Sequence, residues 1–263
     1  MNPAKEAVRH TVGVVPAFEY KLKVTRAPQA WKLKQQEDAE VARALETVGF
    51  RPVAEVVTII PTHNRPEMLL EAVASALDQT VTDHHVVVID DGAGLPKLPN
   101  DERLTAFSLS KNTGVAGVVR NVGIRISSST YLAFLDDDNI WKPDHLEISL
   151  KAHDRGADFT YTAIERVDEN NNRIDVLSVP FSKHAMRSDG FVDMNAVVVR
   201  RTPHVIFSRI RRNFGEFPKE DWELTWRLSR YMNVEHIPIP TVTYRVHSGS
   251  HFTNWNASPF TSA

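Results

Sequence analysis

Residues 131–139 read Tyr131-Leu132-Ala133-Phe134-Leu135-Asp136-Asp137-Asp138-Asn139, an apolar run that ends in three adjacent carboxylates. The run is β-prone and predicts a buried strand. Three like charges side by side repel one another unless something positive lies among them. Mg²⁺ and Mn²⁺ prefer oxygen ligands and readily keep substrate phosphates in their shell, so the pattern indicates a cation site. The alternative is an acidic loop that only begins the next helix.

Composition excludes several classes of protein. The chain has 263 residues, enough for one large domain or two small ones. Its 31 Lys and Arg residues and 33 Asp and Glu residues give a formal net charge of −2, so we expect no nucleic-acid partner. The absence of cysteine excludes disulfides, thiolate metal sites and a cysteine nucleophile.

Targeting signals are also absent from the sequence pattern. The first residues, Met1 to Glu6, lack the apolar core of a signal peptide. No uninterrupted apolar stretch approaches the roughly 18 residues that span a bilayer. We therefore expect a soluble, cytoplasmic protein without a transmembrane segment.

Strands and helices alternate through the first half of the main domain. This alternation predicts a mostly parallel sheet with right-handed crossovers. The expected strands are 56–60, 85–89, 104–109 and 131–135, and the expected helices are one from Pro66, 115–126 and 143–154.

The pattern changes after residue 156, where strands follow one another directly. We expect one domain over residues 56–247, preceded by an extension (1–55) and followed by a polar tail (248–263). The expected second-half elements are a hairpin of 158–167 and 173–179, an apolar run at 194–200, a helix at 220–231, and strands at 234–237 and 241–246.

The extension has its own predicted structure. Residues 12–24 suit a short strand or extended arm around Pro16. Residues 28–48 predict an accessory helix that ends at Gly49. This helix would pack on the main domain or on a second copy of the chain, which makes a homo-oligomer an open possibility. Its expected packed face is Trp31, Ala42, Leu45 and Val48.

Polar side chains follow three of the expected strands. Ligands of open parallel sheets bind outside the carboxyl ends of the strands, so these groups should converge on one site. The sequence has no P-loop, no G-x-G-x-x-G after the first strand and no G-x-S-x-G elbow, which excludes three common alternatives. The converging residues are Thr62 to Arg65, Asp90 and Asp91, and Asp136 to Asp138.

Four motifs in order carry a family resemblance. They resemble the successive motifs of the family 2 inverting glycosyltransferases, strongly over residues 56–155 and more weakly to residue 247. The resemblance implies an α/β fold of the glycosyltransferase A type. In that fold a mostly parallel central sheet flanked by helices forms a Rossmann-like nucleotide-binding half, joined to a mixed α/β acceptor half. The motifs are Val57-Thr58-Ile59-Ile60-Pro61-Thr62-His63-Asn64-Arg65, Val88-Ile89-Asp90-Asp91-Gly92, Gly114-Val115-Ala116 with Arg120-Asn121-Val122-Gly123-Ile124, and Phe134-Leu135-Asp136-Asp137-Asp138-Asn139.

The resemblance implies a nucleotide-sugar donor, most simply a UDP-sugar, and a hydroxyl-bearing acceptor. Thr62 and Asp90 would hold the base, Asp90 by accepting from a ring N–H. Arg120 would pair on the nucleotide side and steady the acidic loop. The donor-binding residues expected in this way are Pro61, Thr62, Asn64, Arg65, Asp90, Asp91, Arg120, Asp136, Asp137 and Asp193.

A divalent metal, Mn²⁺ or Mg²⁺, belongs to the same implied site. Asp136 and Asp138 would be the ends of a D-x-D motif, with Asp138 as the direct metal ligand. Asp137 or Asp136 would contact the ribose. His247, in Tyr244-Arg245-Val246-His247, would complete the metal shell or contact a phosphate; the alternative is an exposed loop histidine.

The catalytic base is expected from the second half. The resemblance places it at the start of the 220–231 helix, so Asp221 is the predicted base and Glu220 the second choice. The alternative is that both acids only complement the helix macrodipole. Asp193 would contact the donor sugar or the acceptor. The implied reaction is a single displacement with inversion.

Two features leave alternatives open. The family usually reads Asp-Asp-Gly-Ser where this chain reads Asp91-Gly92-Ala93-Gly94 after Asp90, so detailed donor contacts are uncertain from sequence. The basic run 209–212 would either meet phosphates or an anionic acceptor, or form a solvated face. The alternative functions are a nucleotidyltransferase, a non-catalytic nucleotide-sugar-binding subunit and a structural interaction protein.

Overall fold

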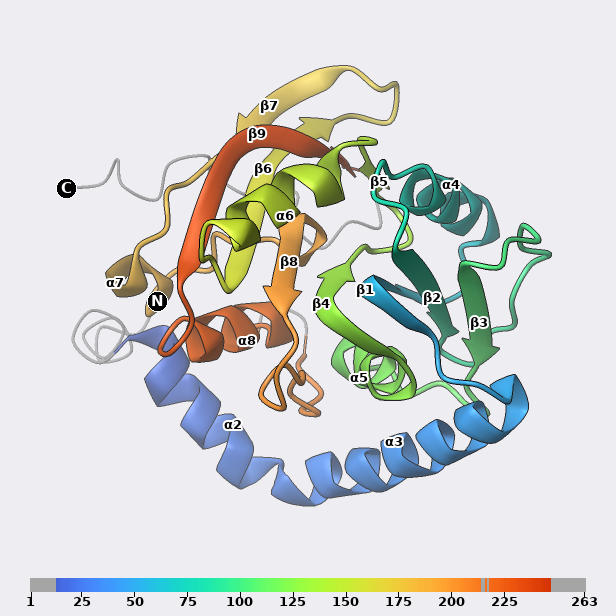
Figure 1. Cartoon of the computed structure of the whole chain (residues 1–263). Helices are drawn as coiled ribbons and strands as arrows, with labels where there is room; N and C mark the ends of the chain where they lie inside the picture. The colour runs from blue at the N-terminus through green and yellow to red at the C-terminus, as the bar shows by residue number, and fades with distance from the viewer. Residues whose placement is uncertain (1–12, 214–215, 217, 247–263) are drawn as a thin grey trace.

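A computed structural model describes residues 13–213, 216 and 218–246 of the chain. A curled, mixed sheet runs through the molecule and helices cover its faces (Figure 1). The predicted α/β class with a mostly parallel central sheet is confirmed. The predicted tail, 248–263, lies outside the described residues. Within the described residues, every helix is too short or too polar to cross a membrane.

The first half of the sheet is parallel throughout. Its strands are ordered β3-β2-β1-β4. Every residue of β2 is buried, as its continuous apolar sequence predicts. The register aligns Thr62 with Asp90 and Asp90 with Ser108, so the carboxyl ends meet at one edge. The elements are β1 (Val53–Thr62), α4 (Pro66–Leu77), β2 (His84–Asp90), β3 (Leu104–Ser108), α5 (Ala116–Ile126) and β4 (Ser128–Phe134).

The second half joins the first through an antiparallel pair, β4 with β8. From β8 the order continues β6-β9-β5, and β7 pairs with the outer part of β6. The elements are β5 (Ile140–Trp141), α6 (His145–Asp154), β6 (Phe159–Val167), β7 (Arg173–Leu177), α7 (Lys183–Met186), η2 (Met194–Ala196), β8 (Val197–Arg200), α8 (Glu220–Leu228) and β9 (Val234–Arg245).

Several strands begin or end at other residues than predicted, and two of these differences involve prolines. β1 continues through Pro61 to Thr62, because proline near a strand end loses only one ladder donor. The two expected final strands are one strand, β9, which pairs with β6 throughout. Its register shifts between Ile237 and Pro240, where the prolines cannot donate to the ladder.

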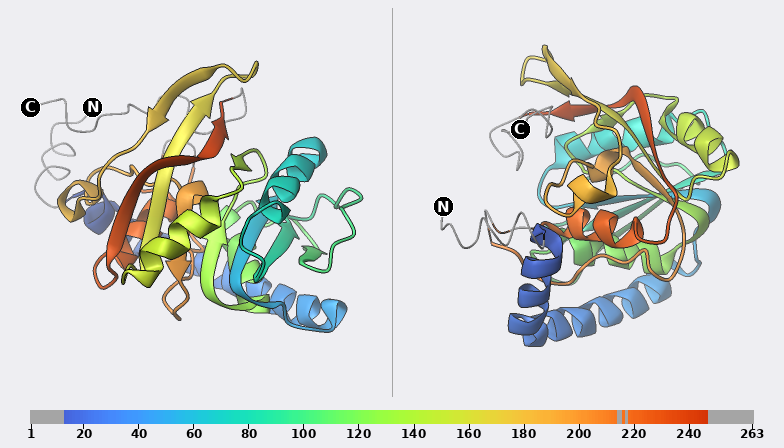
Figure 2. Two further views of the ribbon diagram at one scale, coloured as in Figure 1. Left: turned by 45° about the horizontal axis from the view of Figure 1, so that its top comes forward. Right: turned by 90° about the vertical axis from the view of Figure 1, so that its left-hand side faces the viewer.

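The N-terminal extension is helical, so the predicted strand or extended arm at 12–24 is wrong over its described part. The π-helix η1 (Val15–Glu19) leads into α2 (Tyr20–Thr25) and α3 (Ala27–Val48). Pro16 lies in the first turn of η1, where its missing N–H costs nothing. We call residues 13–48 the arm. It runs along the outside of the molecule past α8 and α5 (Figures 1 and 2).

The predicted packed face of α3 is wrong at Trp31 and Ala42, which are exposed, whereas Leu45 packs on the core. The predicted end at Gly49, with φ 74°, is confirmed. Trp31 is 60% exposed. The buried face instead includes two glutamates that the predicted face lacks. Those carboxylates are buried because arginine, serine and asparagine partners meet them. The buried residues of α3 are Leu33, Glu37, Glu40, Val41 and Ala44.

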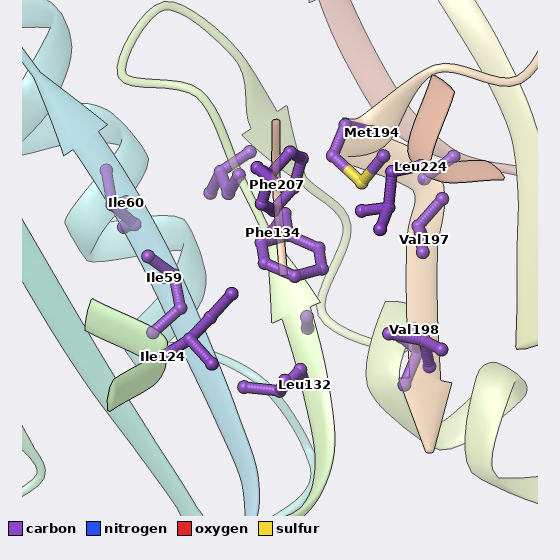
Figure 3. Close-up of a cluster of buried hydrophobic side chains, with 14 of the residues drawn as sticks. Ile59, Ile60, Ile124, Leu132, Phe134, Met194, Val197, Val198, Phe207 and Leu224 are labelled. Carbon is purple, nitrogen blue, oxygen red and sulfur yellow. The ribbon is translucent and has the colours of Figure 1, made fainter. Parts of the chain in front are cut away.

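One apolar cluster extends across both halves of the sheet. In Figure 3, Phe134 of β4 lies between Ile59 of β1 and Val197 of β8. Phe207 packs edge-on against Phe134, with ring centroids 5.2 Å apart. This shared, close-packed core joins the two halves of the sheet below the carboxyl ends of the strands.

We expect Ile59→Ala to lower the free energy of unfolding by about 2–5 kcal/mol, because it opens a cavity beside Gly123 in a close-packed core. Ile174→Ala is the matched control, since Ile174 is 49% exposed. Urea unfolding monitored by circular dichroism measures both. Equal losses for the two variants would contradict the assigned core.

Candidate functional site

A pocket of about 530 Å³ opens where β1, β2 and β4 end. Residues from both halves of the sheet line it, so neither half forms it alone. Most of the predicted site residues meet here, including the whole acidic triplet. Its charged walls are Arg65, Asp91, Arg120, Asp136, Asp137, Asp138, Asp193, Arg212, Lys219, Glu220 and Asp221.

Arg65 neutralises two carboxylates of the triplet. Its Nη1 donates to Asp137 Oδ1 at 2.9 Å and to Asp138 Oδ2 at 2.8 Å. Thr62 Oγ1 donates to the other oxygen of Asp137 at 2.7 Å. Burial raises the pKa of Asp137, and these two donors oppose the rise. The positive charge that the triplet requires is therefore provided in part by the loop after β1.

Arg120 and Asn195 hold the remaining carboxylate, Asp136. Arg120 Nη2 donates to Asp136 Oδ1 at 2.5 Å from a buried position on α5. Asn195 accepts from the Asp136 backbone N–H at 2.6 Å and donates to Oδ2 at 3.2 Å. Asp136 is thus oriented by one side chain from each half of the sheet. Asn195 was not predicted as a site residue; its only signal was its position two residues after Asp193.

Asp193 is buried at the back of the pocket. Its Oδ1 accepts from the backbone N–H of Asn195 at 2.8 Å and from Asn195 Nδ2 at 2.7 Å. Burial raises the pKa of Asp193 to about 7, and the nearby charge of Asp136 adds to the rise. Asp193 therefore exchanges a proton near neutral pH.

Asp221 lies in the first turn of α8 and faces the same pocket. Burial raises its pKa to about 6, with a further rise from Glu220, whereas Arg120 and the Trp222 backbone N–H oppose it. The Trp222 N–H donates to Asp221 Oδ1 at 2.7 Å and leaves the other oxygen for a ligand. A carboxylate with a pKa close to the working pH suits a general base.

The structure places Asp90 outside the pocket. Its carboxylate is fully buried and accepts from the backbone N–H groups of Ala93 and Gly94 and from Ser108 Oγ. Asp91 lines the pocket instead, where it accepts from the Thr113 and Gly114 N–H groups. Of the two adjacent acids, Asp91 is therefore the one that lines the pocket, and a contact of Asp90 with a base stays a prediction.

The remaining predicted residues are Pro61, Asn64 and His247. Pro61 lines the pocket. Asn64 is exposed, with φ 56°, and shapes the turn before α4 rather than the pocket wall. His247 lies outside the described residues. Pocket residues that the prediction did not name include Asn112, Val119, Met194 and Lys219.

Arginines of the basic run 209–212 pair inside the protein, and Arg212 also lines the pocket. Arg209 pairs with Glu37 of α3, and Arg212 pairs with Glu19 of η1. Arg211 Nη2 donates to the Thr113 carbonyl at 2.5 Å. A solvated face is therefore wrong for Arg209 and Arg212, because their partners are glutamates on the arm more than 170 positions away. A contact of this run with phosphate stays a prediction.

The oxygen ligands of the pocket suit a hard divalent cation. Over residues 13–213, 216 and 218–246, no three His, Cys, Asp or Glu side chains are arranged to hold a metal ion. A magnesium site that keeps substrate phosphates needs only one or two protein carboxylates. Asp136 and Asp138 line the pocket and present such carboxylates. The residues therefore fit Mg²⁺ or Mn²⁺ if phosphates complete the shell.

Comparison with known proteins identifies a family and relatives of this chain. The family model for glycosyl transferase family 2 matches residues 57–217. An uncharacterized glycosyltransferase of Rickettsia bellii is 33% identical over 131 residues, covering 48% of this chain and 19% of that protein. The poly(ribitol-phosphate) beta-N-acetylglucosaminyltransferase TarP of Staphylococcus aureus is 37% identical over 101 residues, covering 35% and 31%. The chain thus aligns with a third or less of each relative.

Solved structures share the fold. Residues 1–349 of S. aureus TarS, crystallised in complex with UDP-GlcNAc, superpose with a TM-score of 0.57 at 16% sequence identity. The superposition covers 75% of this chain and 60% of that one. The same TarS fragment crystallised with UDP gives a TM-score of 0.55. At this identity the likeness establishes the fold alone.

We expect Asp193→Asn to flatten the pH dependence of stability. The folded-state pKa of about 7 lies above the unfolded value of about 3.9, so the folded protein binds more protons between them. The free energy of unfolding therefore falls as pH rises through this window. The fall between pH 5 and 8 should be roughly 1–3 kcal/mol smaller in the variant than in the wild type.

Urea unfolding at several pH values tests this expectation. The asparagine of the Asp193→Asn variant keeps an Oδ1 acceptor for both Asn195 donors, so the substitution removes the ionisation and preserves the hydrogen bonds. Asp175→Asn is a control on the β6–β7 hairpin: Arg166 lowers the pKa of Asp175, so this group is ionised in both states above pH 5 and the slope between pH 5 and 8 should not change. Identical slopes for Asp193→Asn and wild type would show that Asp193 ionises normally.

Proposed function

The chain belongs to glycosyl transferase family 2, and we propose that it transfers a sugar from a nucleotide-diphosphate donor to an acceptor hydroxyl with inversion. The observation that carries this proposal is Asp221, a buried carboxyl group with a pKa of about 6 in the pocket that holds the acidic triplet. A general base and a charged donor site thus share one pocket, as glycosyl transfer requires.

The nucleotide half supports a donor of the UDP-sugar class. Asp91, at the end of β2, and the loop after β1 form the pocket wall on that side. TarS, which shares the fold, was crystallised in complex with UDP-GlcNAc. We propose that Asp91 accepts from the base and that Asp137 or Asp136 contacts the ribose.

The second half supports the acceptor and the proton transfer. Asp221 would accept the proton of the acceptor hydroxyl as its oxygen bonds to the anomeric carbon and the nucleotide diphosphate leaves from the opposite face. One displacement inverts the anomeric centre, whereas retention needs a second nucleophile. Asp193, on the same wall, would bind a hydroxyl of the donor sugar or acceptor. Arg120 pairs with Asp136 of the first half and lies near Glu220 of the second, so it links the two halves of the sheet.

A divalent cation completes the proposed donor site. Asp138 and Asp136 would hold Mn²⁺ or Mg²⁺, which stabilises negative charge on the diphosphate as a Lewis acid. Arg65 already contacts Asp137 and Asp138, so it would balance the same carboxylates when no donor is bound.

We expect Asp221→Asn to lower kcat by about 10²–10⁴-fold, because the amide cannot accept the acceptor proton. UDP affinity should stay close to that of the wild type, since Asp221 belongs to α8 in the second half, whereas Asp91 follows β2 in the first. Release of UDP from UDP-sugars, measured with a panel of acceptors, gives kcat, and calorimetry gives the UDP affinity. Glu220→Gln is the matched neighbour and should lose less activity. Unchanged turnover in Asp221→Asn would remove Asp221 from the role of base.

We expect UDP binding to require the cation. Calorimetric titration of UDP should show binding with Mn²⁺ and little binding after EDTA, because the triplet repels a bare diphosphate. Asp138→Asn should weaken the Mn²⁺-dependent binding of UDP. Its circular dichroism spectrum should match that of the wild type, which shows that the fold is intact. Equal UDP affinity with Mn²⁺ and with EDTA would mean that the protein's own cations hold the diphosphate.

A further inference from the structure

We infer that the arm positions the catalytic pocket, with Glu37 and Glu19 acting as positioning residues for the segment 205–213. This inference rests on the function proposed above. The segment contributes Ile210 and Arg212 to the pocket wall and leads towards Lys219, Glu220 and Asp221.

The segment 205–213 has no helix or strand of its own. It belongs to the connection between β8 and α8, from residue 201 to 219, which is long for a link between packed elements. Loops of this length stay ordered only where other parts of the protein bind them. The contacts that hold the segment therefore decide where the pocket wall lies.

Glu37 is the first of these contacts. Its carboxylate is fully buried on α3. It accepts from Arg209 Nε at 2.8 Å and Nη2 at 2.6 Å, a two-point contact with fixed geometry. It also accepts from Arg125 Nη1 at 2.8 Å and Asn121 Nδ2 at 3.0 Å on α5. One carboxylate thus ties the arm, α5 and the segment together.

Asn121 extends the same contact. Its Nδ2 donates to the Phe207 carbonyl at 3.0 Å, and its Oδ1 accepts from the Phe207 N–H at 2.7 Å. Phe207 in turn packs on Phe134, one of the last residues before the acidic triplet. A chain of contacts therefore runs from Glu37 through Asn121 and Phe207 to Phe134 at the end of β4.

Glu19 is the second contact, and it leads to the base. Arg212 Nη2 donates to Glu19 Oε2 at 2.5 Å, and both side chains are buried. Arg212 Nε donates to the carbonyl of Pro218 at 2.5 Å, three residues before Asp221. The path from the arm to the proposed base consists of one ion pair and one hydrogen bond.

Close packing leaves the segment little freedom on its other side. A Cβ atom at Gly117 would lie 2.8 Å from the Ser208 carbonyl oxygen, so the segment touches the backbone of α5. A Cβ atom at Gly114 would lie 3.1 Å from Arg211 Nη2. The segment is therefore clamped between α5 and the arm, and release of the arm side alone would let it move outward.

The arm lies outside the part of the chain that the family model matches, residues 57–217. The segment 205–213 lies inside it. The structure thus shows a segment of the family domain held in place by a part of the chain that precedes the domain.

The test removes the contact between Arg209 and Glu37 by changing the residue on the segment 205–213. Arg209→Met removes the cation and leaves Glu37 paired with Arg125 and Asn121, so the contact of α3 with α5 remains. We expect faster amide hydrogen exchange over 205–213 in the full chain. We also expect a roughly 10- to 100-fold lower kcat per folded molecule, because a displaced wall misplaces the reacting groups. UDP affinity should fall less than kcat does, because Asp91, Asp136 and Asp137, which are proposed to hold UDP, also have contacts outside the segment.

Three further variants test the inference and control for side effects. Glu37→Gln breaks the clamp from the arm side and should reproduce both effects. Asp38→Asn removes the neighbouring carboxylate, which bonds Arg125 and Lys34 but not the segment, and should leave exchange and kcat unchanged. Arg209→Lys keeps the charge without the two-point contact. Its amide exchange over 205–213 should therefore be slower than that of Arg209→Met and faster than that of the wild type.

The outcomes separate this inference from the proposed function. Normal kcat in both Arg209→Met and Glu37→Gln, in a wild type that turns over, would overturn the positioning role. Unchanged exchange over 205–213 would overturn it as well. If the wild type turns over no donor, the proposed function fails, and the exchange comparison alone then decides whether the arm orders the segment.

Discussion

Three adjacent carboxylates at the end of one strand impose the constraint on which the rest of the site depends. Like charges at this spacing are tolerated only where positive groups and donors surround them. Arg65 and Arg120 supply the charge, and Asn195 supplies hydrogen bonds from the opposite half of the sheet. The loop after β1, the helix α5 and the turn before β8 are therefore all directed at the same few atoms.

This arrangement explains why the pocket lies between the two halves. The four parallel strands end at one edge, and the antiparallel β4–β8 pair brings the second half against that edge. Each half then provides what the other lacks: the first provides the acidic triplet and its arginines, and the second provides Asp193 and Asp221. Both second-half carboxyls are buried near Asp136, so their pKa values rise towards neutrality.

A second set of buried charges lies behind the pocket. Glu37 and Glu19 are carboxylates of the arm that bind Arg209 and Arg212. Burial raises the pKa of Glu19, and the charge of Arg212 opposes the rise. Loss of one partner from such a pair leaves a buried charge unbalanced, which makes the pair sensitive to substitution. The arm is in this respect part of the site rather than a covering of it.

Sequence by itself determined the alternation of apolar strands and amphipathic helices, and with it the sheet and the edge where the acids gather. Those features are local: a β-branched run, a proline at a helix start or a glycine at a helix end acts through its immediate neighbours. Only the tertiary structure decided which polar groups face the pocket. Asp90 and Asp91 are adjacent and chemically alike, yet the turn uses Asp90 and leaves Asp91 on the pocket wall. The arm glutamates and the arginines at 209–212 could not be paired from sequence, because the partners lie more than 170 positions apart and pairing at such distance has no local pattern.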